Sequence, residues 1–379
     1  MKQQNTPVHS RIASLDAYRG LMLFIMMLNH LILFPFIHLG SAHDWLQTYV
    51  YGPFGILSNS EGFYFLAGIV SGIVYGKILL YKNTLDLWPK IKKRILQMYG
   101  VHLLLLSAFA LLVATSQTYV ENWKELHQLI GCWKDQDGIR YFLQHPGFGL
   151  LMGSVFLYCP PFFDILPLYM LFLALTPFVL KLLLKKMTPV VLVTSVLLWF
   201  IPQYIHEDLI EKTLQMYMPV KLGWFNPLAV QLLFVSGLVM GFFYVKRTLF
   251  SIQKIALIAG CGLFFTYGLL HMSHVDLHSC HHLGFLRLIT FTLKAFIAYF
   301  LARYWTIQPL ILLGKHSLMM FSYHFACVYA LVLVLPQISM TTLPLQLVYF
   351  GMASLSMWIV AYILEKQREF KSRALEAVV

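Results

Sequence analysis

Long apolar segments alternate with short polar connections along almost the whole chain. A helix that crosses a lipid bilayer needs about 20 mostly apolar residues. Ten segments meet this requirement to within a few residues, and we expect each to form a membrane-spanning helix. They cover residues 20–39, 61–80, 95–115, 165–184, 190–205, 227–245, 255–272, 285–304, 309–335 and 343–364. The fifth segment is short, and the ninth is long enough to be tilted or broken.

The composition agrees with this pattern. Of the 379 residues, 59% are hydrophobic and 12% are charged, and the mean hydropathy is +0.70. An ordinary soluble domain carries about twice this share of charged residues. These values exclude a disordered chain and a plain water-soluble enzyme, and five cysteines in this length exclude a disulfide framework. The sequence therefore predicts one all-α, polytopic membrane domain.

The basic residues follow the positive-inside pattern. The chain carries 28 Lys and Arg against 16 Asp and Glu, a formal net charge of +12. Most of these cations fall in alternate connections and in the two termini, which indicates that both termini are cytoplasmic. Because the cations form no single patch, we expect membrane lipid and not nucleic acid as the partner. The oligomeric state is left open.

Two ionisable residues of the first span share one face of the predicted helix. His30 follows Arg19 by eleven residues, or about 1100° of rotation, which is about 20° beyond three full turns. Arg19 would then lie at the inner edge and His30 about 16 Å deeper, near the midplane. Such an arginine can hold phosphates of a cytosolic donor, and a neutral histidine can take a proton from a hydroxyl. The spacing alone also fits an interfacial anchor and a packing histidine.

Several longer blocks resemble the OpgC family of membrane acyltransferases, which succinylate periplasmic glucans. The first runs from Arg11 to Gly20 (Arg-Ile-Ala-Ser-Leu-Asp-Ala-Tyr-Arg-Gly) and continues at Asn29-His30. An Arg, ten residues and a His are also typical of type-3 membrane acyltransferases, and the opening is similar to that of heparan-type acetyltransferases. The second block is Glu-Gly-Phe-Tyr-Phe-Leu-Ala-Gly at 61–68. Its last residue opens a glycine stripe, Gly68, Gly72 and Gly76, that lets helices approach closely. Later blocks, at 163–169, 225–234 and 313–318, extend the resemblance over nearly the whole chain.

This resemblance implies an enzyme of the bacterial inner membrane. It would move an acyl group, succinyl or acetyl, from cytosolic acyl-CoA to a hydroxyl of a periplasmic or envelope glycan. By the same comparison His30 is the general base and Arg19 binds the donor. Glu61, at the outer end of the second span, is a second catalytic candidate; it could pair with His30, hold the acceptor, or be an interfacial carboxylate in water. A basic run could contact CoA phosphates, although such runs are by default positive-inside anchors: Lys92, Lys93 and Arg94.

Other polar residues in or next to the spans are candidates for substrate binding. Lys294 should lie near mid-depth, where a cation would suit an anionic acyl group such as succinyl, and Arg287 could serve similarly or extend to the interface. His324 is more simply a hydrogen-bonded structural histidine than a second base. The residues that precede the fourth and sixth spans can also be helix N-caps. The full set is Asp164, Asn226, Gln231, Arg287, Lys294 and His324.

A histidine-rich stretch before the eighth span contains the residue types of a metal site. No second ligand cluster accompanies it, so no metal is expected. Two other functions stay open on the sequence. The buried polar residues could line a transport path for a small anionic or sugar substrate, and His30 and His324 could be paired haem ligands. The stretch comprises His271, His274, His278, Cys280, His281 and His282.

Overall fold

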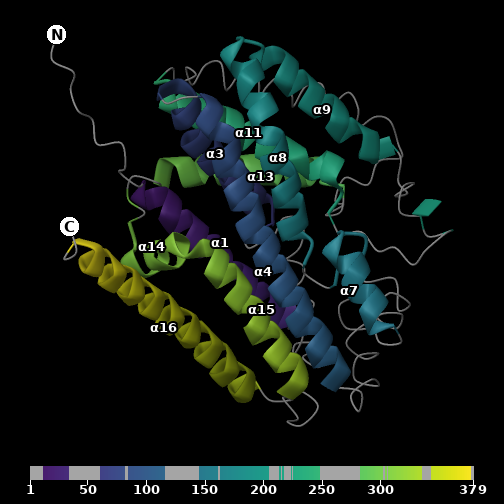
Figure 1. The fold of residues 1–379 in the computed structure, drawn as a ribbon, viewed down its shortest axis with the longest axis vertical. Coiled ribbons are helices and arrows are strands. Elements are labelled where there is room, and N and C mark those ends of the chain that lie inside the picture. Colours follow the sequence, from purple (N-terminus) through teal and green to yellow (C-terminus); the bar gives the residue numbers. More distant parts are fainter. Residues whose placement is uncertain are drawn as a thin grey trace. The chain divides into compact units, whose positions relative to one another are not determined.

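A computed structural model shows an all-α protein over the part of the chain that it describes. That part holds eleven α-helices and one short 3-10 helix, with no strand among its residues (Figure 1). The contacts divide the chain into two units, Met1–Asp44 with Leu293–Val379, and Trp45–Thr292. We call these unit 1 and unit 2 and describe each by itself. The described residues are 12–33, 60–81, 84–115, 145–160, 163–204, 213–214, 216, 223, 225–247, 282–301, 304, 306–334 and 343–376.

The protein is a membrane protein with several helices that can cross a bilayer. By length and apolar composition, five described helices qualify. Two further apolar helices are α9 (Thr188–Tyr204) and α15 (Ser317–Val334). They count as shorter, because α9 has 17 residues and the side chains of α15 are described only as far as Val328. The count of ten spans and the cytoplasmic termini therefore stay predictions, and the predicted span 255–272 lies outside the described residues. The five helices long and apolar enough to cross a bilayer are α3 (Ser60–Tyr81), α4 (Leu87–Thr115), α8 (Ile165–Leu184), α11 (Pro227–Val245) and α16 (Leu343–Glu376).

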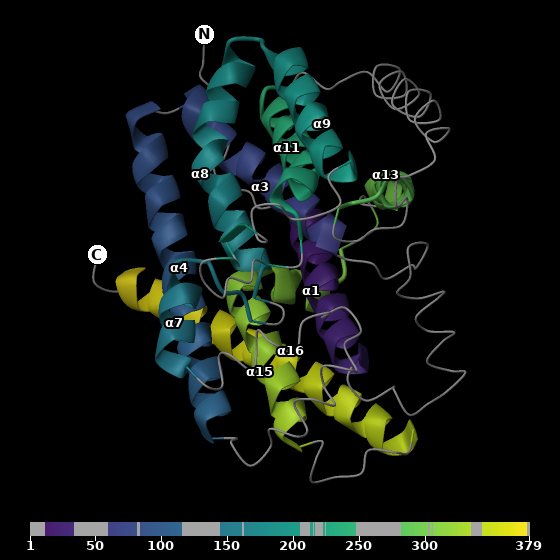
Figure 2. The same cartoon turned by 90° about the vertical axis from the view of Figure 1, so that its right-hand side faces the viewer.

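Unit 2 is built around a close crossing of α3 and α11. A Cβ atom added at Gly68 would collide with the carbonyl oxygen of Phe234, and one added at Gly237 would collide with that of Phe65. The two backbones touch because both helices present glycine at the crossing, as the glycine stripe predicts. Helix α8 packs against this pair and against α4, and α4 in turn contacts α7 (Pro146–Ser154) (Figure 2). The short 3-10 helix η3 (Thr84–Asp86) leads into α4.

Buried hydrogen bonds fix the start of α13 (Phe285–Leu301) against α9. The indole nitrogen of Trp199 donates to the carbonyl of Leu283 at 3.0 Å, and Gln203 donates to that of His282 at 2.6 Å. Both donors lie on α9 and are buried. An unmade hydrogen bond of a buried polar group is costly, so these two bonds set the position at which α13 begins.

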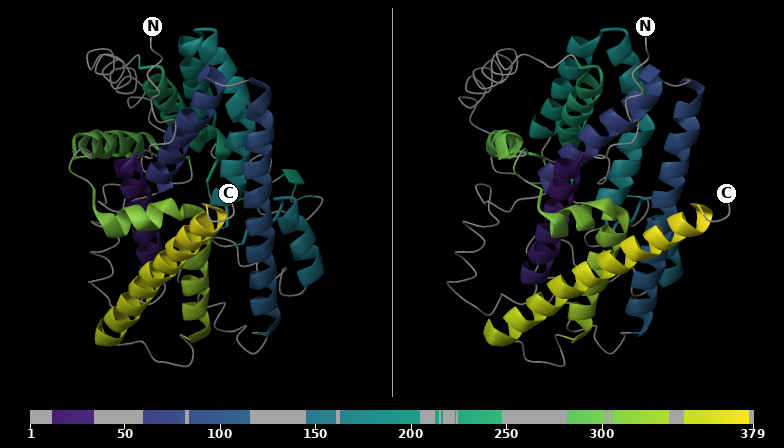
Figure 3. Two further views of the ribbon diagram at one scale, coloured as in Figure 1. Left: turned by 60° about the vertical axis from the view of Figure 1, so that its left-hand side comes forward. Right: turned by 90° about the vertical axis from the view of Figure 1, so that its left-hand side faces the viewer.

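Unit 1 contains α1 (Ala13–Leu33), α14 (Gln308–Lys315), α15 and α16, together with the last part of α13. A Cβ atom at Gly20 would collide with the carbonyl of Leu310, and one at Gly314 with that of Asp16, so α1 and α14 also pack backbone against backbone. Helix α16 lies beside α14 and α15 and is the longest described helix (Figure 3).

Three predicted boundaries change in unit 1. The ninth predicted span, 309–335, is broken at His316 into α14 and α15. Helix α1 begins at Ala13, ahead of the predicted span start at residue 20, so Arg19 lies inside the helix, and its place at the inner edge of the membrane stays a prediction. Helix α16 runs to Glu376, beyond the predicted end at 364, because charged residues with good helix propensity continue the helix past the apolar segment.

Candidate active site

Helix α1 directs Arg19 and His30 toward the same neighbour, α15. The Arg19 guanidinium donates a hydrogen bond to the hydroxyl of Ser317, and His30 Nδ1 lies 3.2 Å from His324 Nε2. Ser317 and His324 are seven residues apart, which places them on one face of α15. The shared helical face expected from the spacing of Arg19 and His30 is thus present in the structure.

The two imidazoles form a hydrogen-bonded pair deep in unit 1, which we call the histidine dyad (His30 and His324). His324 is 1% exposed, and its Nδ1 lies 2.5 Å from the carbonyl oxygen of Phe321. A carbonyl can only accept, so His324 Nδ1 carries the proton and donates it. In a neutral ring its Nε2 is then an acceptor, which requires His30 to donate from Nδ1.

This chain of hydrogen bonds assigns the tautomer of His30. With its proton on Nδ1, the basic lone pair of a neutral His30 lies on Nε2. The ring centroids are 5.2 Å apart and tilted by 35°, so the rings meet through their nitrogens and do not stack. A base whose other nitrogen is held by a hydrogen-bonded partner is the arrangement that general-base histidines use. The dyad therefore has the geometry of a base and a positioning residue.

The Arg19 guanidinium contacts Asp16 as well as Ser317 and remains partly exposed. Its Nη1 lies 3.7 Å from a carboxylate oxygen of Asp16, one turn earlier on α1, and the Arg19 side chain is 25% exposed. Guanidinium groups bind phosphate through several fixed N–H donors. Ser317, a neutral partner, orients this group without cancelling its charge. No pattern in the sequence marked Ser317 as a site residue.

Glu61 and Arg287 form a buried ion pair in unit 2. Arg287 Nε and Nη2 each lie 2.7 Å from the same oxygen of Glu61. The Arg287 side chain is 10% exposed and the Glu61 side chain is 7% exposed. The hydroxyl of Ser60 donates to the other Glu61 oxygen at 3.2 Å. Arg287 is therefore paired with Glu61 inside unit 2, and Glu61 is not an isolated carboxylate in water. Fixing the start of α13 is what brings Arg287 to this position.

Of the two predicted N-caps, one is formed. Asn226 accepts a hydrogen bond from the backbone N–H of Leu228 at 2.9 Å, ahead of Pro227 at the first turn of α11. Asp164 directly precedes α8 but makes no capping hydrogen bond, and it is only 6% exposed. The N-cap interpretation of Asp164 is therefore wrong.

The remaining candidates are spread over both units. Gln231 exchanges hydrogen bonds of 2.8 and 2.7 Å with Ser195 of α9, so its amide ties two helices together. Lys294 is half-buried on α13. Lys92 and Lys93 are exposed on α4, and Arg94 is half-buried and donates to Gln97 at 2.9 Å.

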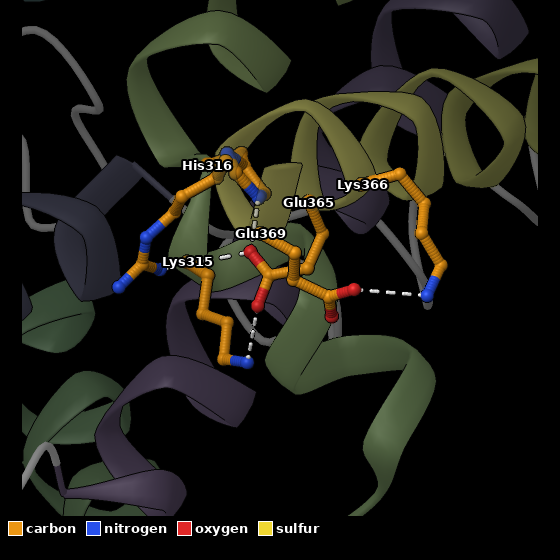
Figure 4. Close-up of polar contacts among 6 residues, drawn as sticks. Lys315, His316, Glu365, Lys366 and Glu369 are labelled. Carbon is orange, nitrogen blue, oxygen red and sulfur yellow. Dashed lines mark hydrogen bonds and ion pairs between the residues drawn. The ribbon is translucent and has the colours of Figure 1, made fainter. Parts of the chain in front are cut away.

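No group of metal-ligating side chains occurs among the residues that the structure describes. The predicted histidine-rich stretch lies outside them except for His282, which is buried at the start of α13. A basic cluster that the sequence did not indicate lies where α14, α15 and α16 meet (Figure 4). Its carboxylate comes from Glu365, far along the chain from its partners Lys315 and His316.

Comparison with known protein families places the chain in one of them. The profile of a protein family described as OpgC protein matches residues 11–369, which is nearly the whole chain. No curated protein and no solved structure matches it. The matched range contains the histidine dyad, Arg19 and the Glu61–Arg287 pair.

Proposed function

The chain belongs to the OpgC family of glucan-modifying membrane acyltransferases, and we propose that it moves a succinyl or acetyl group from cytosolic acyl-CoA to a hydroxyl of a periplasmic or envelope glucan. The observation that carries this proposal is the histidine dyad. A neutral His30 with its proton held on Nδ1 presents Nε2 as a base. We further propose that the protein is a multi-pass protein of the bacterial inner membrane.

The proposed reaction is a direct acyl transfer. His30 Nε2 takes the proton of the acceptor hydroxyl while the hydroxyl oxygen attacks the thioester carbonyl carbon. The carbon–sulfur bond then breaks, and the CoA thiolate leaves and receives the proton from His30. The products are an ester and free CoA, and no oxidant, metal or water is consumed.

His324 acts through His30 in this scheme. When His30 becomes an imidazolium, its Nδ1–H still points at His324 Nε2, whose own N–H is held by the Phe321 carbonyl. The partner keeps the ring in one orientation and one tautomer, the role that the buried carboxylate has in a Ser-His-Asp triad. His324 is thus a positioning residue and not a second base.

Arg19 is proposed to hold phosphate of the donor. Its guanidinium is oriented by Ser317 and remains partly exposed, so it can form charge-assisted hydrogen bonds with an incoming anion. Lys92, Lys93 and Arg94 stay weaker candidates for the same role.

Glu61 is reassigned from a catalytic to a binding role. Its carboxylate oxygens already accept hydrogen bonds from Arg287 and Ser60, which makes it a poor general base. A buried ion pair of this kind presents fixed donors and acceptors to polar groups such as sugar hydroxyls. We assign this pair and the buried, non-capping Asp164 to acceptor binding, together with Lys294 as the candidate cation for an anionic acyl group.

Replacement of His30 tests the proposal. In cells that lack the native gene, the full-length chain should restore a mass increase of the envelope glucans that fits a succinyl or acetyl group, and His30→Ala should lower transfer by about 100-fold to 10,000-fold. Membrane insertion and the amount of folded variant should be unchanged. Retained acylation by folded His30→Ala would refute the mechanism, and substrate flux without CoA consumption would indicate a transporter instead.

A further inference from the structure

A cluster of basic groups in unit 1 converges on the single carboxylate of Glu365. Lys315 Nζ lies 2.8 Å from one carboxylate oxygen, and His316 Nε2 lies 2.9 Å from the other. Arg368, one turn further along α16, approaches the second oxygen at 3.6 Å. Figure 4 shows Lys315 and His316 on either side of the Glu365 carboxylate. We call Lys315, His316 and Arg368 the basic cluster.

The basic cluster carries more positive charge than Glu365 can balance. Lys315 and Arg368 are two cations against one carboxylate, before any proton on His316 is counted. The neighbouring Lys366 does not change this balance, because it pairs with Glu369 on the same helix at 2.9 Å. Arg368 is 55% exposed and Lys315 31%, so both cations are open to a ligand.

The basic cluster adjoins the proposed donor-binding arginine. His316 is followed directly by Ser317, whose hydroxyl accepts the hydrogen bond from Arg19. The close packing of Gly20 and Gly314 holds α1 against α14 at this same end of unit 1. Arg19 therefore contacts the residue that directly follows the Lys315–His316 part of the basic cluster, at the junction of α14 and α15.

The length of α16 indicates that the basic cluster lies outside the hydrocarbon core. Its 34 residues span about 51 Å, whereas the hydrocarbon core needs about 30 Å. The charged final third of the helix, which includes Glu365 and Arg368, must then project beyond the core. A ligand that meets several oriented cations there is expected to carry several anionic groups, and phosphates fit this description best.

We infer that the basic cluster binds phosphate groups of an anionic ligand, and that Glu365 holds the cations in place while competing with that ligand for them. The inference rests on the proposed function in naming the ligand: the phosphates of the CoA donor would extend from Arg19 onto Lys315 and Arg368. The phosphate of an anionic lipid headgroup has the same chemistry, so the test includes both sources.

The test measures binding of CoA itself, without acyl transfer, to the purified full chain in phosphatidylcholine nanodiscs. Lys315→Gln and Arg368→Gln should each weaken CoA binding about fivefold to tenfold. Glu365→Gln should strengthen it about threefold, because a competing carboxylate is removed. Lys315→Gln and Arg368→Gln should weaken the binding of dephospho-CoA less than the binding of CoA. The matched control is Lys366→Gln, an exposed cation of the same helix, which should change binding by less than about twofold.

The sign of the Glu365→Gln effect separates binding from packing. If the cluster only fastens α16 to α14, Glu365→Gln will tighten the binding of neither CoA nor phosphatidylglycerol, and the inference is overturned. Should Glu365→Gln fold poorly, the salt dependence of CoA binding to Lys315→Gln decides: it must be shallower than that of the unchanged chain.

Lipid binding and the proposed reaction are separated by two further measurements. Added phosphatidylglycerol that raises the melting temperature of the unchanged chain, but not of Lys315→Gln or Arg368→Gln, would identify a lipid headgroup as the source of the phosphate. Unchanged binding of both CoA and phosphatidylglycerol in these variants would overturn the inference. His30→Ala should bind CoA normally, so a failure of the catalytic proposal leaves this result intact.

Discussion

The positioning role of His324 can be tested with a matched set of variants. His324→Ala removes two groups of a buried side chain: Nε2, which accepts from His30 Nδ1, and Nδ1, which donates to the Phe321 carbonyl. His324→Gln keeps an acceptor at about the position of Nε2. His324→Asn is too short to reach His30 but can still donate to the Phe321 carbonyl.

The expected loss can be worked out from the contacts. A neutral hydrogen bond contributes ~0.5–1.5 kcal/mol, or about twofold to tenfold in rate. Loss of a fixed tautomer and ring orientation adds to this, since only molecules with the proton on Nδ1 present Nε2 as the base. We expect the kcat of His324→Ala and His324→Asn to fall about 10-fold to 100-fold, with an unchanged KM for acyl-CoA. The kcat of His324→Gln should stay within about fivefold of the original.

The assay is acyl transfer by purified variants over a range of acyl-CoA concentrations up to saturation, combined with thermal unfolding. His324 is almost fully buried, so His324→Ala also leaves a cavity and should lower stability by ~2–4 kcal/mol. Added imidazole should enter this cavity and restore part of the kcat of His324→Ala. Equal kcat values for the Asn and Gln variants, or full activity of the Ala variant, would refute the assigned tautomer.

Three further predictions follow from the other contacts. Arg19→Lys should raise the KM for acyl-CoA about tenfold with little change in kcat, because an ammonium lacks the planar fork; an unchanged KM would remove Arg19 from donor binding. Glu61→Gln or Arg287→Gln alone should cost ~3–5 kcal/mol of stability by leaving a buried charge, and the double variant should be more stable than either single one in thermal unfolding; additive losses would contradict the pairing. Gly237→Ala should prevent the close helix crossing and lower the melting temperature sharply, whereas Gly100→Ala, which meets nothing within 4 Å, should be neutral or stabilising; similar effects of both would show that the crossing is not critical.

Local features of the sequence predicted local features of the fold. Apolar segments predicted helices at 61–80, 165–184 and 227–245, and these are present. Asn226 followed by proline predicted the start of α11, and the glycine stripe predicted a close helix approach by α3, although not that α11 is the partner. The length of the ninth predicted span showed that it could be tilted or broken, but not that the break lies at His316. Nothing in an apolar segment shows where a neighbouring backbone will approach.

Partners distant in sequence could not be predicted in the same way. Periodicity showed that Arg19 and His30 share a helical face, but not that this face meets Ser317 and His324 of α15. Asp164 had the sequence position of a cap, yet its side chain does not cap.

The sequence by itself determined the family, the helical class, the membrane environment and the pair Arg19 and His30. These depend on hydrophobic length, helical pitch and short motifs, which are properties of neighbouring residues. The tertiary structure alone decided that His324 is the hydrogen-bond partner of His30, that Arg287 pairs with Glu61, and that the basic cluster contacts Glu365. A side chain acquires its chemistry from the groups that packing brings to it, and helix packing joins residues that no local pattern connects.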